Sequence, residues 1–378
     1  MNNKRFSVRA IVITVVVTLL LTLGVGVFAA RCLLGPGGLA MVESVGLIRR
    51  RFIAGYDEAE AVDEALRGLV DGLGDRWSYY LSPEERAQME QIHQNSYVGI
   101  GIRYQQSAEP FGMEIVDVTP GGPADQGGLT VGEFIVGIGG ELLTEDNFDQ
   151  LVATIGGEEG EQVTLTVQGT DGTRREAALT YQTVDDPPVE YGMMEGDVGY
   201  VRLENFYYTS ADSLQAAVEE LKTEGAKGLI FDVRANPGGF VTELTQMLDY
   251  LLPEGPIFAE HSKYGPTHVT ESDANCVDLP MVVLVDGNSY SAAELFAAQL
   301  RESVGAKLVG TQTCGKGYYQ QGFPLENGGS LNISTGMYTT GGGTSLIGVG
   351  LTPDEAVEDP EEQVDRAHEV ILKEIETR

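Results

Sequence analysis

The feature that most constrains this chain is an uncharged apolar stretch near its N-terminus. Residues 10–30 carry no charged side chain and are rich in Val, Leu and Ile, and the basic residues of Asn2–Arg5 and Arg9 precede them. The stretch has the roughly 20 residues that a helix needs to cross the hydrocarbon core. Positive charge before a span keeps that end in the cytoplasm. We therefore expect residues 1–31 to form a cytoplasmic N-terminus and a single-pass anchor, with all later residues at the cell surface or in the periplasm.

A cleaved secretion signal is the main alternative for this stretch. Val27-Phe28-Ala29 offers small residues at the usual spacing for cleavage, but the apolar run is longer than a typical signal core. The length favours an anchor. Cys32 follows the stretch, and Arg31 directly before it argues against lipidation at that cysteine.

Charge excludes two classes of partner. The chain of 378 residues has 24 Lys and Arg against 57 Asp and Glu, a formal net charge of -33. Such a balance disfavours nucleic acid and an anionic membrane surface as the main partner. Whether Cys276 and Cys314 form a disulfide is left open by the sequence, and no spacing typical of metal ligands is present. We expect no metal and no organic cofactor.

The remaining chain divides into three regions with different patterns. Residues 32–95 show mainly helical periodicity, ending in a helix that Ser82 caps and that runs to about His93. Residues 96–182 contain short runs between glycines that predict the strands of a small barrel. The runs are Val98–Ile102, Met113–Val118, Phe134–Ile138 and Val163–Val167, with one helix at Asp146–Ile155.

Residues 183–378 begin with the linker Thr183–Pro188 and then alternate strands with amphipathic helices. The alternation predicts an α/β core, and the near-continuous apolar runs predict strands buried on both faces. We expect strands at Val198–Leu203, Gly228–Val233, Met281–Val285 and Lys307–Val309, and helices at Ser210–Glu224, Thr242–Leu252 and Ala292–Leu300.

Ser291 is a candidate nucleophile because it stands at a strand-to-helix turn. There the amide of Ala292 and the helix dipole would face a developing oxyanion. The same position also suits a simple helix cap. None of the four histidines lies in a motif that would bring it to Ser291, so a histidine base is unconvincing. A buried lysine can act as the base when its uncharged form is populated.

Lys316 is the candidate base. It stands between Gly315 and Gly317 after an apolar strand, and no carboxylate stands close to it in the sequence. A surface loop is the alternative for this segment. A third element, Asp232–Gly239, follows a buried strand and ends in Pro-Gly-Gly, which would present an amide to the same oxyanion or make only a tight turn.

Four motifs in one order resemble those of the C-terminal processing peptidases, a family of serine-lysine peptidases. They are Gly72–Asp75 with Ser78–Leu81, Asp232–Gly239, Ser289–Glu294, and Gly315–Gly317 with Gln320; Gly348–Asp354 resembles the family's last core segment. The resemblance implies an α/β core of crotonase/ClpP-like architecture. It also makes Ser291 the nucleophile, Lys316 the base, Gln320 a residue that orients the lysine, and Ala292 with Gly238 or Gly239 the oxyanion-hole amides. The chain departs from the family pattern at Ala293 and Tyr290.

Residues 96–182 resemble the PDZ domain that this family carries before its core. The resemblance rests on Gly121–Leu129, Gly132–Ile135 and the run Tyr97, Val98, Gly99, Ile100, Gly101 and Ile102, which matches the carboxylate-binding loop. Glycine-freed amides can hold a chain end while an edge strand pairs with the peptide. We therefore expect protein tails as substrates.

The expected function is cleavage of proteins near their C-termini, outside the cytoplasm, without nucleic acid as a partner. A homo-oligomer or a regulatory partner is left open. Two rival functions remain: a tethered PDZ protein with an inactive core, and a crotonase-like enzyme that acts on small molecules.

Overall fold

The computed structural model describes residues 8–378, so Asn2–Arg5, with the basic Lys4 and Arg5 of the expected cytoplasmic end, lie outside the described part. The chain forms two units, which divide between Leu66 and Arg67. The first holds the long helix α1 (Val8–Arg51) and most of α2 (Glu58–Asp71). The second holds every strand of the chain that is described.

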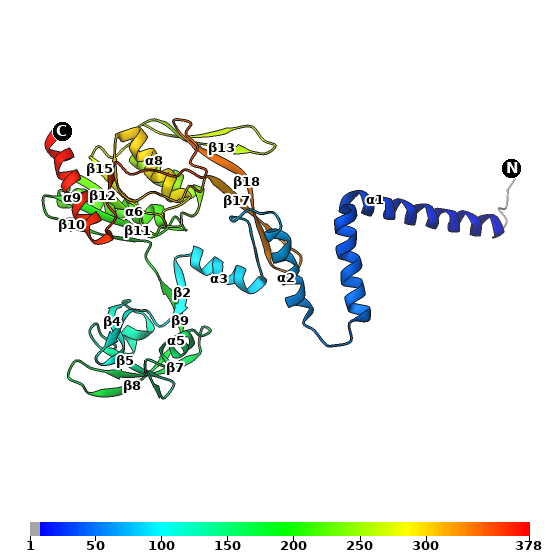
Figure 1. Ribbon diagram of the computed structural model, residues 1–378, viewed down its shortest axis with the longest axis horizontal. Coiled ribbons are helices and arrows are strands. Elements are labelled where there is room, and N and C mark those ends of the chain that lie inside the picture. The colour runs from blue at the N-terminus through cyan, green and yellow to red at the C-terminus, as the bar shows by residue number, and fades with distance from the viewer. Residues whose placement is uncertain (1–7) are drawn as a thin grey trace, which may run out of the picture. The chain divides into compact units, whose positions relative to one another are not determined.

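Helix α1 contains the apolar stretch, and it does not end at Arg31 as the predicted boundary implied. It bends at Gly35, whose backbone (φ 62°, ψ -176°) is not helical, just before Pro36, and it continues to Arg51 (Figure 1). Proline lacks the amide that would close the preceding turn, which explains a bend here. The helix is long and apolar enough to cross a membrane, a test that a secretion signal also passes.

Residues 102–180 form the β-rich module that the alternating runs predict. Its sheet has the order β3-β4-β5-β7-β8, with β6 beside β5, and β3 is an edge strand. Met113, Ile115, Ile135 and Leu165 are fully buried in its core. The elements are β3 (Ile102–Ala108), β4 (Phe111–Val118), α4 (Pro123–Gln126), β5 (Phe134–Ile138), β6 (Glu141–Leu142), α5 (Phe148–Val152), the 3-10 turn η1 (Ala153–Ile155), β7 (Gln162–Gln168) and β8 (Arg174–Thr180).

The predicted single strand Val98–Ile102 is wrong. The chain turns at Gly101, whose φ of 74° favours glycine, so that β2 (Ser96–Gly99) and β3 are separate strands. Strand β2 pairs with β9 (Gln182–Asp185) in a two-stranded neck through which the chain enters and leaves the module. The expected linker at Thr183 therefore begins inside a strand.

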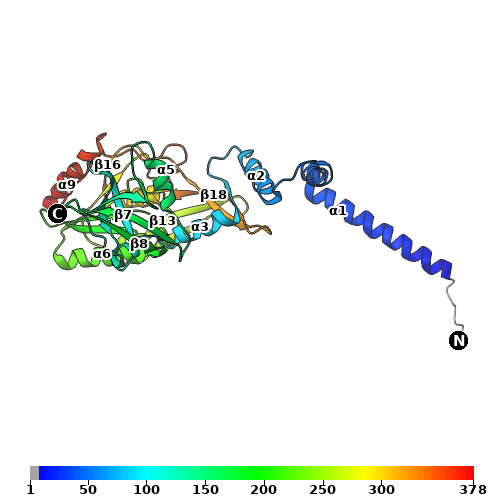
Figure 2. The ribbon, with the colours of Figure 1, turned by 90° about the horizontal axis from the view of Figure 1, so that it is seen from below.

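A six-stranded sheet in the order β10-β11-β12-β15-β16-β19 forms the α/β core. All its neighbouring pairs are parallel except β10 with β11. Leu229 and Phe231 of β12 pack with helices α6, α7 and α8, whereas Ile230 between them packs with α9, and Figure 2 shows α6 and α9 on opposite sides of the strands. Both faces are buried, as the apolar runs predict.

The bounds of β11, β12, β15, β16, α6, α7 and α8 are close to the predicted ones, whereas β10, β19 and α9 were not predicted. The strands are β10 (Val189–Met194), β11 (Val198–Leu203), β12 (Gly228–Asp232), β15 (Met281–Val285), β16 (Lys307–Gly310) and β19 (Glu355–Ala356), and the helices are α6 (Ser210–Glu224), α7 (Val241–Leu251), α8 (Ala292–Val304) and α9 (Pro360–Thr377).

A second, antiparallel sheet was not predicted. Its order is β1-β18-β13-β14, and β17 also pairs with β18. Through the pairing of β1 with β18, a segment that precedes the PDZ-type module becomes part of the core. The strands are β1 (Tyr79–Leu81), β13 (Gly255–Ser262), β14 (His268–Ser272), β17 (Tyr318–Pro324) and β18 (Ser330–Thr340), and helix α3 (Pro83–His93) follows β1 with the predicted Ser82 cap.

Parallel strands place the three candidate catalytic segments together. Strands β12, β15 and β16 are neighbours in the sheet and all run in one direction, so the turns after them meet at one edge. Those turns carry Gly239, Ser291 and Lys316. Ligand sites of open α/β sheets lie at this carboxyl edge.

The buried carboxylate of Asp232 fixes the first of these turns. Arg234 donates to both of its oxygens, at 2.6 and 2.9 Å, and the Tyr200 hydroxyl donates at 2.6 Å. Arg234 also donates to Gln363 of α9. The Asp232 carboxylate is fully buried and the Arg234 side chain largely so, and an ion pair of this kind holds its partners only while both remain.

We expect Asp232→Ala to lower the free energy of unfolding by about 3 kcal/mol or more, because it leaves the Arg234 guanidinium buried without its counter-charge. Tyr200→Phe removes a single hydrogen bond from the same carboxylate and should cost about 1 kcal/mol. Urea unfolding of both variants measures the two losses. Equal losses would show that the ion pair is not what stabilises this turn.

Candidate active site

Ser291 lies between strand β15 and helix α8, as predicted. Its backbone has φ 62° and ψ -119°, an uncommon conformation for a residue other than glycine. Such strain is concentrated at functional sites and at nucleophile turns. Ser289 stabilises the turn, because its buried hydroxyl donates to the carbonyl of Val233 at 2.6 Å. The strained turn leaves the Ser291 side chain at a cavity wall.

The structure separates the two glycines that the sequence left as alternatives. Gly238 packs against the nucleophile turn, since a Cβ on it would meet the Ala292 nitrogen at 2.8 Å. Its own N–H, however, donates to the Asn236 side chain at 2.8 Å. Gly239 lines the cavity beside Ser291 and Ala292. Within residues 8–378, neither the Gly239 nor the Ala292 N–H group has a hydrogen-bond acceptor, so both are free to donate to a bound group.

Glu294, the last residue of the motif Ser289–Glu294, joins the two halves of the site. Its side chain is fully buried in the first turn of α8. One oxygen accepts from the Thr313 hydroxyl at 2.5 Å and from Gly315 N at 2.8 Å. The other accepts from Lys316 N at 2.8 Å and from Ser291 N at 3.1 Å. The carboxylate therefore ties the backbone of the serine to the backbone of the lysine.

The Lys316 side chain is half-buried among aromatic rings. Its Nζ lies 4.8 Å from the centre of the Trp77 ring and 5.5 Å from that of Tyr290. Burial lowers the pKa of Lys316 below its ordinary value, against the opposing charges of Cys314, Asp75 and Glu294. No carboxylate is close to this lysine in the sequence, but folding brings Asp75 and Glu294 to it from distant segments.

The structure gives no hydrogen bond between Ser291 Oγ and Lys316 Nζ within the described residues. Catalytic hydrogen bonds often form only with substrate bound. Gln320 also does not bond to the lysine: its amide donates to the Ser334 hydroxyl at 3.0 Å. Ser334 N in turn donates to Ser78 Oγ at 3.0 Å. Gln320 thus belongs to a hydrogen-bond network with Ser334 and Ser78.

Ser291 and Lys316 share one cavity of about 900 Å³. Its other walls include an apolar surface made by Tyr207, Phe240, Leu244 and Leu295. Contrary to the sequence-based expectation, a histidine is present: His93 lines the cavity, with its ring 4.8 Å from both Tyr207 and Phe240. Burial lowers the pKa of His93, and no hydrogen bond joins it to Ser291. No sequence motif announces this placement, which depends on helix α3.

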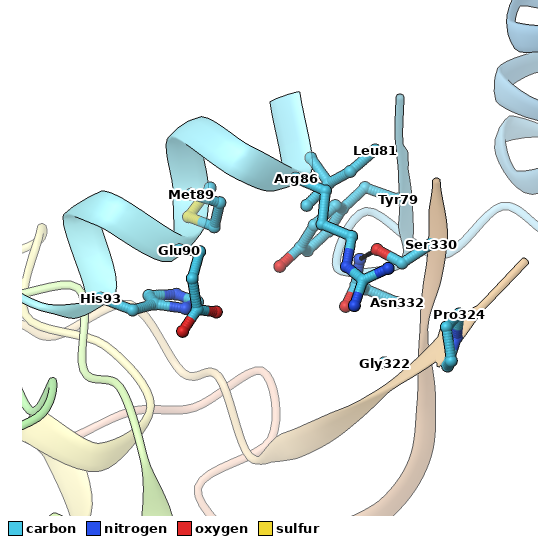
Figure 3. A pocket seen from close by; sticks show the side chains of 10 residues that line it. All are labelled: Tyr79, Leu81, Arg86, Met89, Glu90, His93, Gly322, Pro324, Ser330 and Asn332. Atoms are coloured by element: carbon cyan, nitrogen blue, oxygen red, sulfur yellow. Dashed lines mark hydrogen bonds between the residues drawn. The ribbon is translucent and has the colours of Figure 1, made fainter. Parts of the chain in front are cut away.

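A smaller hollow of about 190 Å³ continues the cavity between α3 and strands β1, β17 and β18 (Figure 3). Figure 3 shows Arg86 of α3 reaching toward Ser330 and Asn332 on the strands, and Glu90 beside His93. Seven residues line both spaces: Tyr79, Leu81, Met89, Glu90, His93, Gly322 and Asn332. The catalytic cavity therefore extends sideways over the second sheet.

The predicted peptide-binding run lines a separate groove of about 270 Å³. Tyr97 to Ile102 form one side, with Val152 and Ile155 from the helical turn opposite. The open edge of β3 borders this groove, so an extended peptide could add to the sheet there. The structure thus brings all six predicted residues to one concave surface.

The described residues offer no metal centre. No group of three or more His, Cys, Asp or Glu side chains in residues 8–378 is arranged to hold an ion. Cys276 and Cys314 are both free thiols in this part of the chain, as is Cys32.

Comparisons with known proteins identify the family to which the chain is related. The model of peptidase family S41 matches residues 197–357, and a PDZ-domain model matches residues 114–169. The chain is 30% identical over 341 residues to a carboxy-terminal-processing protease of Bartonella bacilliformis, covering 88% of this chain and 77% of that protein. It is 28% identical over 309 residues to the carboxy-terminal processing protease CtpA of Bacillus subtilis, covering 81% and 66%.

A solved structure shows the same fold. The photosystem II D1 C-terminal processing protease matches with a TM-score of 0.51 at 24% identity, over 88% of this chain and 91% of that one. The family match, the PDZ match and the identity to a relative over most of both chains lead to one conclusion. The chain belongs to peptidase family S41, as a carboxy-terminal-processing serine peptidase with a PDZ domain.

Proposed function

We propose that this peptidase cuts protein substrates near their C-termini with a dyad of Ser291 and Lys316. One observation carries the proposal: both side chains line a single cavity, beside two amides, of Ala292 and Gly239, that have no acceptor. The sideways extension of the cavity over β17 and β18 gives room for an extended chain rather than a small molecule, which argues against the crotonase-like rival.

In the reaction, the uncharged amine of Lys316 takes the proton as Ser291 Oγ bonds to the scissile carbonyl carbon. The Ala292 and Gly239 N–H groups donate to the oxyanion that forms. As the C–N bond breaks, the lysine returns the proton to the leaving amine. Water then attacks the acyl-enzyme ester, with the lysine again taking a proton, and restores free Ser291.

The PDZ domain would deliver the substrate tail. Its loop of Tyr97 to Ile102 supplies amides for the terminal carboxylate, and the edge of β3 supplies backbone partners. An anchor in α1 would hold both domains outside the cytoplasm, at the cell surface or in the periplasm; the apolar helix supports this location, and a cleaved secretion signal would also export the enzyme.

Removal of either dyad side chain should abolish cleavage. We expect Ser291→Ala and Lys316→Ala to lower kcat/KM for an unstructured protein with an apolar tail by about 10⁴-fold or more. His93→Gln is the matched control in the same cavity. Its kcat/KM should fall by less than the ~10²-fold that is typical when a general base is removed. A loss in the His93 variant as deep as in the lysine variant would assign the base to the histidine. Tail binding without turnover in the wild type would favour the tethered binding protein.

Glu294→Gln should impair catalysis strongly, because a carboxamide puts an N–H₂ group against backbone amides that all donate. We expect kcat to fall by at least ~10²-fold and the free energy of unfolding by about 3 kcal/mol. Glu302→Gln is a matched control on the same helix, where the carboxylate accepts from Thr340 and Gly342. Unchanged kcat in the Glu294 variant would show that its carboxylate does not align the dyad.

A free terminal carboxylate should matter for binding more than for chemistry. Amidation of a peptide substrate's C-terminus should raise KM about tenfold with little change in kcat, because the loop amides lose a charged acceptor. Tyr104→Ala, at the groove, should reduce this preference, whereas Tyr264→Ala, at a fully separate exposed position, should not. Equal KM for both peptides would exclude carboxylate recognition.

A further inference from the structure

The Lys316 amine is held by a segment that the proposed mechanism does not use. This segment is the turn Asp75–Ser78, which precedes β1 and reaches the site because β1 pairs with β18. Trp77 of the turn and Tyr290 of the nucleophile turn lie 5.9 Å apart with their rings tilted by 32°. The lysine Nζ is within cation–π range of both rings.

Trp77 is not placed as a core residue. It is half-buried and lines the catalytic cavity rather than any hydrophobic cluster. The Arg76 guanidinium covers its ring at 4.1 Å and donates to Cys314 Sγ at 3.3 Å. The ring is thus fixed from its own turn and from the loop that carries Lys316.

Asp75 supplies a negative charge on the same side of the lysine. Its carboxylate accepts from Ser78 Oγ at 2.6 Å and from Trp77 N at 3.1 Å. Burial acts to raise the pKa of Asp75, but the hydrogen bonds of Ser78 and Ser334 and the charge of Lys316 outweigh it, so the pKa lies below its ordinary value. The carboxylate is therefore ionised wherever the enzyme would work.

An aromatic face and a carboxylate both favour the ammonium form of a lysine over the amine. The mechanism needs the amine, so these contacts oppose the activation of the base. Every ionisable group that faces Lys316 enters this balance: Asp75, Glu294 and Cys314 favour the charged form, the Tyr290 phenol stands beside it, and Arg76 lies behind Trp77.

We propose that Trp77, with Tyr290 and Asp75, is a positioning residue that holds protonated Lys316 away from Ser291 and thereby sets the pH above which the dyad works. The inference rests on the proposed function of Lys316 as the base. It concerns residues of this chain that the dyad itself does not include, and Tyr290 stands where the chain departs from the family pattern.

The test is the pH dependence of kcat/KM for the full chain in detergent, with an unstructured protein that has an apolar tail. Activity rises with pH as Lys316 loses its proton. Trp77→Leu removes the π-face that stabilises the ammonium, so the rise should move to lower pH by about one unit. Tyr290→Leu and Asp75→Asn should move it in the same direction, and Trp77→Phe should restore most of the wild-type profile.

A second experiment measures the protonation of Lys316 directly and does not depend on catalysis. NMR of the chain labelled with ¹³C at the lysine ε-carbon reports each amine's titration, and the Lys316 signal is assigned by its loss in Lys316→Arg. The titration should move to lower pH in Trp77→Leu and remain in place in Tyr207→Leu, which alters a cavity ring that does not contact the lysine. This measurement remains valid for any variant that folds, active or not.

The outcomes are distinct. The inference would be overturned if the pH profile of kcat/KM and the Lys316 titration in Trp77→Leu and Tyr290→Leu coincide with those of the wild type. It would also be overturned if they move to higher pH. A moved titration together with an active Lys316→Ala enzyme would instead refute the dyad while leaving the contact between ring and ammonium established.

Discussion

The site depends on one buried carboxylate. Glu294 accepts hydrogen bonds from the backbone of Ser291, of Gly315 and of Lys316, and it does so from the first turn of α8. A carboxylate buried without such donors would be very costly, so the loop that carries the lysine and the turn that carries the serine are stable only together. The relative placement of Ser291 and Lys316 is therefore a property of the folded core and not of two independent loops.

The protonation of Lys316, the proposed base, is subject to opposing effects. Withdrawal from water favours the neutral amine, whereas Asp75, Glu294 and two aromatic faces favour the ammonium. Burial is the larger effect, so the pKa of Lys316 lies below its ordinary value.

The sequence predicts the parallel core well and the second sheet poorly, for a physical reason. Met281–Val285 is buried on both faces and reads as a continuous apolar run, and Ser210–Glu224 shows one clear helical face. Ser330–Thr340 is half-buried along its length and mixes polar with apolar residues, so it lacks the regular apolar pattern from which a strand is predicted. The contacts of Asp75 and Trp77 with Lys316 depend on pairing across this sheet. Local patterns could therefore locate the serine and the lysine but not their neighbours.

Because β2 pairs with β9, the PDZ domain is an insertion whose two ends lie side by side. Ser96 stands opposite Asp185 and Gly99 opposite Gln182, so the domain leaves and rejoins the rest of the protein at one place. Everything between these strands can change in length or identity without altering the register of β1 on β18. The domain that binds a substrate tail and the core that cleaves it can therefore evolve separately. A different PDZ domain can replace this one while the peptidase core stays the same.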